Sequence, residues 1–143
     1  MSTRPDSVTA EIELRLVVPG SPSLPVRADV AYDHGDPYAV RVAFHTGNTD
    51  TVEWTFARAL LTDGVTHPVG EGDVQVWPSH SGGRPVVCIS LSSPSGRAMF
   101  EAPLAALVEF LTKTYAVVPT GSESDYVDVE AELALLLWSE RDL

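Results

Sequence analysis

Four histidines and one cysteine are the residues of this 143-residue chain that could bind a metal or attack a substrate. His34, His45, His67 and His80 are scattered, and no two stand at the i, i+4 or short-loop spacing of zinc ligands. Cys88 lies in an apolar run, where a buried structural thiol is expected and not a reactive one. The sequence therefore predicts no metal site and no cofactor. A single cysteine also allows no disulfide within the chain and favours a reducing, cytoplasmic compartment.

Serines and glycines give no better anchor for catalysis. No serine occupies a Gly-x-Ser-x-Gly elbow, and the segment 79–83, which contains His80, is expected to be a loop. The glycines at 70–72 and 82–83 lack the following Lys-Ser/Thr and helix start that a phosphate-binding loop requires. Paired acids, as at Asp33 and Asp36, fall in predicted turns, where such residues are common for structural reasons. We expect no catalytic residue, and the chain is predicted not to be an enzyme.

Net charge indicates what kind of partner the chain can bind. Twenty acidic residues against nine basic ones give a charge of −11, and only one of the basic residues is a lysine. Nucleic acids and anionic membranes are bound largely through clustered cations, which this sequence does not offer. No apolar run approaches the ~20 residues that span a bilayer, and residues 1–6 show no apolar core of a secretory signal. The predicted partners are therefore proteins, with no nucleic acid and no membrane insertion.

Alternation of apolar and polar residues predicts strands through most of the chain. The expected elements of the first half are strands at Thr9–Val18, Leu24–Tyr32, Tyr38–Thr46 and Thr51–Phe56, and a short helix at Ala57–Thr62. The expected strands of the second half are Asp73–Trp77, ended by Pro78, then Pro85–Leu91 and Gly96–Glu101. A helix then starts at Pro103 and carries an apolar stripe to Tyr115 at spacings of three and four. This order of elements predicts an α+β fold in one domain.

The two ends of the chain are expected to differ from the body of the domain. Residues 1–8 are predicted to be flexible, and 119–125 to be a linker before a final helix that starts near Asp125–Asp128. Apolar residues cover that helix more widely than one stripe requires, so it is buried either entirely in its own domain or partly against a neighbouring subunit. The residues expected at such a subunit interface are Leu133, Leu136, Leu137 and Trp138.

Tryptophans are the remaining candidates for contact with a ligand or partner. Trp54 alternates with Val52 and Phe56, which favours a core position over a stacking platform for nucleic-acid bases. Trp77 precedes Pro78 at an expected strand end, and it fits either a core or an interface position.

A set of short motifs is spread from about Glu11 to Leu137. The motifs are Asp36-Pro37-Tyr38-Ala39-Val40, Phe44-His45-Thr46-Gly47, Thr51-Val52-Glu53-Trp54, Phe56-Ala57-Arg58, Gly72-Asp73-Val74, Val76-Trp77-Pro78, Val87-Cys88-Ile89, Leu91-Ser92-Ser93-Pro94 and Glu101-Ala102-Pro103. Together they resemble the SsgA-like family of sporulating, filamentous actinobacteria. Within that family, the run Glu13–Val18 and the near absence of insertions are most similar to the SsgB branch.

The resemblance implies a fold and a role. It implies two antiparallel sheets followed by helices, similar to the Whirly-type architecture, in a subunit that assembles as a homotrimer. It implies a protein placed at septum sites by an SsgA-like positioning protein, where it recruits the tubulin-like protein FtsZ and promotes its assembly. The expected partner contacts are residues that recur in the family motifs: Asp36, Pro37, Tyr38, His45, Trp77 and Pro78. The alternative is a Whirly-like protein that binds single-stranded nucleic acid, against which the negative charge argues.

Overall fold

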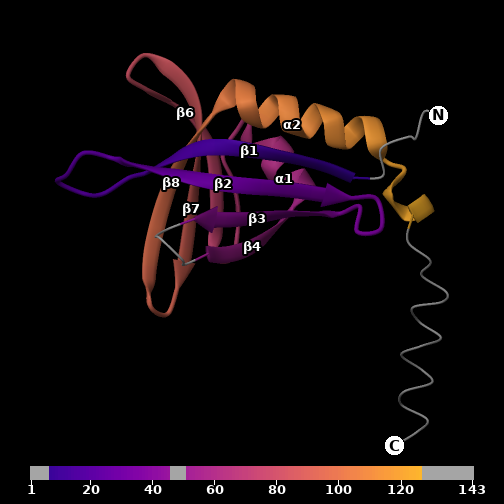
Figure 1. The fold of residues 1–143 in the computed structure, drawn as a ribbon, viewed down its shortest axis with the longest axis horizontal. Helices are drawn as coiled ribbons and strands as arrows, with labels where there is room; N and C mark the ends of the chain where they lie inside the picture. The colour runs from indigo at the N-terminus through magenta and orange to yellow at the C-terminus, as the bar shows by residue number, and fades with distance from the viewer. Residues whose placement is uncertain (1–6, 46–50, 127–143) are drawn as a thin grey trace, which may run out of the picture.

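The computed structural model describes residues 7–45 and 51–126 of the chain (Figure 1). Its elements are β1 (Ser7–Leu16), β2 (Leu24–Asp33), β3 (Ala39–His45), β4 (Thr51–Ala57), α1 (Arg58–Gly64), β5 (Val69–Glu71), β6 (Val74–Ser81), β7 (Arg84–Ser93), β8 (Gly96–Pro103), α2 (Leu104–Val117) and the short 3-10 helix η1 (Glu123–Tyr126). A mostly antiparallel sheet with two α-helices confirms the predicted α+β class.

The strands form one sheet in the order β4-β3-β2-β1-β8-β7-β6-β5. Its two halves join where β1 meets β8, at the pairs Arg15–Glu101 and Leu16–Phe100. The expectation of two separate sheets is therefore not confirmed, and neither is the Whirly-type description. Alternation along a strand shows which side chains are buried, but it does not show which distant strand is the neighbour.

The sheet curls strongly, and one aromatic contact shows by how much. β3 and β8 stand three strands apart in the sheet, about 14 Å at ordinary strand spacing. Yet the rings of Phe44 and Phe100 stack with centroids 4.6 Å apart. The sheet must bend into a half-barrel for these two rings to meet across its concave side.

The core fills the concave side of the half-barrel. The inward residues of the strands meet the buried side of α2, which carries Leu107, Phe110 and Leu111. Figure 1 shows α2 running beside β1. The shorter α1 approaches β6 closely at Gly64, since a Cβ there would clash with the side chain of Val76. Glycine thus sets how near this helix can lie to the sheet.

Several boundaries differ from the sequence prediction. Pro78 does not end a strand: β6 continues to Ser81, so His80 lies in a strand and not in a loop. β5 pairs only with Val74–Val76, so β6 has an open side beyond Val76, where a residue without an N–H is tolerated. β5 itself has three residues, too few for a periodic pattern, and it was not predicted.

Regular structure extends into both segments that the sequence predicts to be irregular. Val8, in the segment predicted to be flexible, is buried in β1. The predicted linker enters η1, whose first residue is Glu123. The final helix and the four expected interface residues, Leu133, Leu136, Leu137 and Trp138, lie outside the described residues. None of the helices within 7–45 and 51–126 is long and apolar enough to span a membrane.

Candidate functional site

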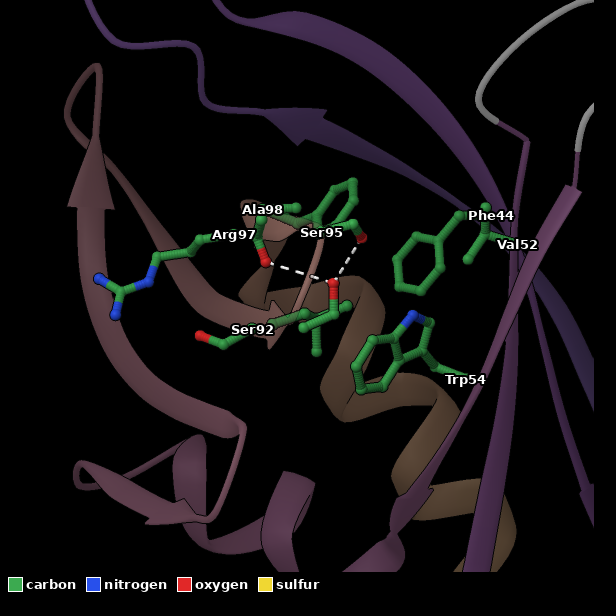
Figure 2. Close-up of a pocket in the computed structure, with 11 residues that line it drawn as sticks. Phe44, Val52, Trp54, Ser92, Ser95, Arg97 and Ala98 are labelled. Carbon is green, nitrogen blue, oxygen red and sulfur yellow. Dashed lines mark hydrogen bonds between the residues drawn. The ribbon is translucent and has the colours of Figure 1, made fainter.

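One end of the half-barrel holds a hollow of about 300 Å³ between β4 and the β7–β8 hairpin. We term it the Trp54 hollow. Phe44 and Phe100 lie against it from the core, and Val52 and Trp54 line it from β4. Figure 2 shows the Trp54 indole turned toward this space beneath Phe44. The curl of the sheet creates the hollow, because it brings strands from opposite halves of the sheet to face each other.

The lining indicates that the hollow suits apolar side chains. The hydroxyls of Ser93 and Ser95 on its rim form hydrogen bonds within their own turn. They lie 2.9 Å apart, and the Ser93 hydroxyl donates to the Gly96 carbonyl at 3.4 Å (Figure 2). Arg97 extends away from the hollow. A volume of this size is at the lower limit of small-molecule sites. It can accept a few apolar side chains of a peptide.

Trp54 occupies an intermediate position that the sequence did not predict. It packs against the core and lies parallel to Phe56, with 6.2 Å between ring centroids. It also remains half-buried at the edge of the hollow. Arg97, the cation nearest to it in the lining, points elsewhere, so the site lacks the basic groove that base stacking by a single-strand binder requires.

A second groove of about 490 Å³ lies where β1 and β8 diverge beside the start of α2. Its polar lining carries Glu13 and Glu101 against Arg15 and Arg84, above an apolar floor that includes Leu104. Because charges of both signs line it equally, this groove selects for neither anions nor cations.

The six predicted partner contacts do not form one surface. Asp36, Pro37 and Tyr38 lie in the β2–β3 turn, whereas His45 lies at the opposite end of β3. Trp77 and Pro78 lie on β6, in the other half of the sheet. The carbonyl of the buried Pro37 accepts a hydrogen bond from the Tyr32 hydroxyl at 2.9 Å, and His45 Nε2 lies 2.7 Å from Asp29 Oδ2. Asp36 and Tyr38 are exposed, and partner contact by each of the six residues stays a prediction.

Cys88 and Trp77 pair directly across β7 and β6. Burial, followed by the nearby Glu101 carboxylate, raises the pKa of the Cys88 thiol above its ordinary value. The group therefore stays a protonated thiol at neutral pH and is a poor nucleophile. This outcome confirms the expected structural cysteine.

The histidines do not converge. His34 Nδ1 lies 3.3 Å from Asp33, and His67 Nδ1 lies 3.0 Å from the Thr66 hydroxyl. His80 is exposed on β6. In the part of the chain that the structure describes, no group of three or more His, Cys, Asp or Glu residues could hold a metal ion.

The most unusual polar site is Arg58, the first residue of α1, whose side chain is 1% exposed. Its Nη1 donates to the carbonyl oxygens of Thr114 at 3.1 Å and Val118 at 2.8 Å. Its Nη2 donates to Glu123 Oε2 at 2.9 Å. The guanidinium also lies 3.9 Å from the ring centroid of Tyr115. One side chain thus connects α1 to the end of α2 and to η1.

Glu123 completes this arrangement from the C-terminal side. Its Oε1 accepts the Gly121 N–H at 2.8 Å. A hydrogen bond from its own backbone, followed by the bond from Arg58, lowers the pKa of the Glu123 carboxyl below its ordinary value. Sequence reasoning missed this site because an arginine opening a short helix normally faces solvent, and its partners lie 56 to 65 residues further along the chain.

Comparison with known proteins gives the family. The family model described as Streptomyces sporulation and cell division protein, SsgA, matches residues 26–123, more than half of the chain. The chain belongs to the SsgA family, which confirms the prediction from its motifs.

Its similar relatives define the branch. It is 57% identical over 138 residues to the sporulation-specific cell division protein SsgB of Frankia casuarinae, covering 96% of each chain. It is 54% identical over 131 residues to SsgB of Streptomyces coelicolor, covering 92% of this chain and 96% of that one. A crystal structure of an SsgA-like sporulation-specific cell division protein from Thermobifida fusca superposes with a TM-score of 0.83 at 51% identity, covering 94% of this chain and 98% of that chain. The chain therefore lies in the SsgB branch.

Proposed function

We propose that this chain is a sporulation-specific cell division protein that works as an adaptor, binding other proteins at the septum. The cell-division role is supported by its relatives, which carry the name sporulation-specific cell division protein SsgB at 47–57% identity in four organisms. A solved structure at 55% identity comes from a study in which mutations in SsgB correlate to longitudinal cell division during sporulation of Streptomyces coelicolor.

The observation that supports binding over catalysis is the Trp54 hollow. Protein interfaces are enriched in aromatic anchors that fill apolar recesses surrounded by polar residues. An apolar hollow rimmed by serines on a chain of net charge −11 fits that description. The adaptor recruits the tubulin-like FtsZ and promotes its assembly, acting in the cytoplasm at the septum, where an SsgA-like protein positions it. It contributes no catalytic step.

Co-sedimentation with purified FtsZ tests this function. The protein at micromolar concentration is expected to enter the pellet with FtsZ polymers and to stay in the supernatant when FtsZ is left unpolymerised. Equal amounts of protein in both pellets would contradict recruitment to polymers.

The adaptor is proposed to act as a homotrimer. Light scattering is then expected to give about 46 kDa, three times the 15.4 kDa chain. A mass of one chain at every concentration would contradict the trimer without affecting FtsZ binding.

A further inference from the structure

The sheet has two edges, and they differ in length. β5 ends the sheet on one side with three residues, too short to pair stably with another strand. β4 ends it on the other side with seven residues, Thr51–Ala57. Native proteins protect such edges with proline, lysine, bulges or a covering segment. β4 contains neither proline nor lysine, and among the described residues no strand pairs with its outer side.

The hydrogen-bond pattern shows which backbone groups of β4 are available. The Arg58 N–H donates to the Tyr38 carbonyl at 2.8 Å, so this pair is a hydrogen-bonded one in the β3–β4 ladder. Hydrogen-bonded pairs alternate along an antiparallel ladder. In the register that pairs Trp54 with Val42, the residues bonded to β3 are therefore Val52, Trp54 and Phe56.

The intervening residues Thr51, Glu53 and Thr55 consequently direct their N–H and C=O groups away from β3. No turn, loop or cap hydrogen bond among the described residues reaches the backbone of any of them. These groups form a row of donors and acceptors at the spacing that an added strand requires.

The Trp54 hollow lies beside this edge. Val52 is 44% exposed and, with Trp54, faces the hollow. Along any strand added to β4, alternate side chains would point into the hollow, and the others would lie on the outer face beside Glu53. The edge supplies backbone pairing, and the hollow supplies a place for apolar side chains.

We propose that β4 and the Trp54 hollow form a strand-addition site for an extended segment of a partner protein, with apolar side chains at alternate positions and a basic residue opposite Glu53. Strand addition of this kind gains affinity from the backbone and specificity from alternate side chains. The proposal deepens the proposed adaptor function and rests on it only for the nature of the ligand, a polypeptide.

The size of the hollow and the charge of Glu53 on the outer face of β4 favour this occupant. β4 and the β7–β8 hairpin line one space of about 300 Å³, which holds the side chains of one added strand. A second copy pairing through its own β4 would place its β3 another ~4.8 Å outward, toward the hairpin, so it needs more room than a single added strand. Glu53 is exposed, and no ion pair within the described residues involves it, so a cation opposite it gains a partner.

The test uses a displayed library of random nine-residue peptides, selected on the full chain. Selected peptides are expected to alternate apolar and polar residues with a central Arg or Lys. The decisive variant is Val52→Lys, which adds an inward charge at the edge, and Val108→Lys on α2 is the matched control because that valine is 39% exposed. Peptide affinity is expected to fall at least tenfold in the first variant and to be unchanged in the second.

Amide exchange separates strand addition from simple surface contact. The amides of Glu53 and Thr55 are expected to exchange rapidly in the free protein and slowly with peptide bound. Thr55→Pro removes one of these outward N–H groups without removing a bond to β3, and it is expected to abolish binding while the fold persists by circular dichroism. Peptides that bind Val52→Lys and Val108→Lys equally, or leave both amides unprotected, would overturn the site.

The same variants distinguish failure of the site from failure of the adaptor function. One outcome is that Val52→Lys co-sediments with FtsZ as wild type does and that no selected peptide loses affinity for this variant. That outcome would reject the strand-addition site and leave the adaptor function standing. The opposite outcome is that selected peptides bind Val52→Lys more weakly but the wild-type protein does not co-sediment with FtsZ. That outcome would reject the FtsZ partner and leave the strand-addition site. A dimer in light scattering that Val52→Lys dissociates would show that the occupant is a second copy and would overturn the proposal.

Discussion

Replacing Arg58 with alanine removes a buried cation that three separate parts of the fold share. The variant loses the bonds to two carbonyl oxygens at the end of α2 and the ion pair with Glu123. It also removes the contacts with the rings of Tyr32 and Tyr115, whose centroids lie 4.8 and 3.9 Å from the guanidinium.

The expected cost follows from what remains after truncation. Each hydrogen bond from a charged donor contributes about 1.5–3 kcal/mol, but the desolvation of a buried guanidinium offsets much of the total. Removing one member of a buried pair costs about 3–5 kcal/mol in comparable cases. Arg58→Ala should therefore lose about that much of a total stability on the order of 5–15 kcal/mol. Arg58→Lys should lose less stability than Arg58→Ala but remain below wild type, because an ammonium keeps the charge but cannot donate in both directions as the planar guanidinium does.

Urea unfolding followed by tryptophan fluorescence measures this cost. The midpoint should fall strongly in Arg58→Ala with an unchanged dependence on urea concentration. Arg27→Ala is the control, since Arg27 lies 3.8 Å from Glu11 in an exposed pair that should contribute below about 0.5 kcal/mol. An Arg58→Ala protein as stable as Arg27→Ala would refute the role assigned to the buried guanidinium.

Three further predictions concern pH, packing and thiol chemistry. The pKa of the Glu123 carboxyl is lowered from its ordinary 4.5, so its contribution to stability should be complete above that pH and be lost as pH falls through the folded-state pKa. The urea midpoint of Glu123→Gln should therefore fall less steeply with decreasing pH than that of wild type, and an identical pH dependence would contradict this role. Gly64→Ala should cost about 1–3 kcal/mol by pressing on Val76, and Val76→Ala should offset part of that cost, whereas additive losses would contradict the clash. Cys88, 3% exposed with a raised pKa, should react with a thiol reagent at pH 8 only as fast as urea-dependent opening allows, and rapid labelling of the folded protein would contradict its burial.

Local patterns in the sequence predicted individual strands better than their partners. Alternation in Leu24–Asp33 and Thr51–Ala57 corresponds to strands because β2 has one buried face and β4 has one face that becomes buried toward Phe56. The joining of the halves through Arg15–Glu101 depends on backbone pairing between residues 86 positions apart, for which no local pattern exists. The sequence predicts a strand end at Pro78, because the open side of β6 that tolerates this proline depends on the shortness of β5, which no local pattern reveals.

The candidate site was harder to predict than the fold. Trp54 was expected in the core, and only the curl of the sheet leaves part of it facing a hollow. Motif residues such as Pro37 and His45 have hydrogen-bond partners within the fold, so recurrence in a family motif has a structural explanation beside the predicted partner contact. Arg58 belonged to one of the quoted motifs, yet its importance became apparent only from carbonyl oxygens that α2 brings to it.

The unequal edges of the sheet limit what the molecule can build. An open-ended filament of edge-joined subunits needs a donor edge and an acceptor edge on every copy. Here the end at β5 is stepped, with three residues in β5 and an open side of β6 beyond Val76, whereas β4 is an unbroken strand of seven residues. Edge-to-edge growth would have to join an unbroken strand to a stepped edge, a mismatch that disfavours an open-ended filament.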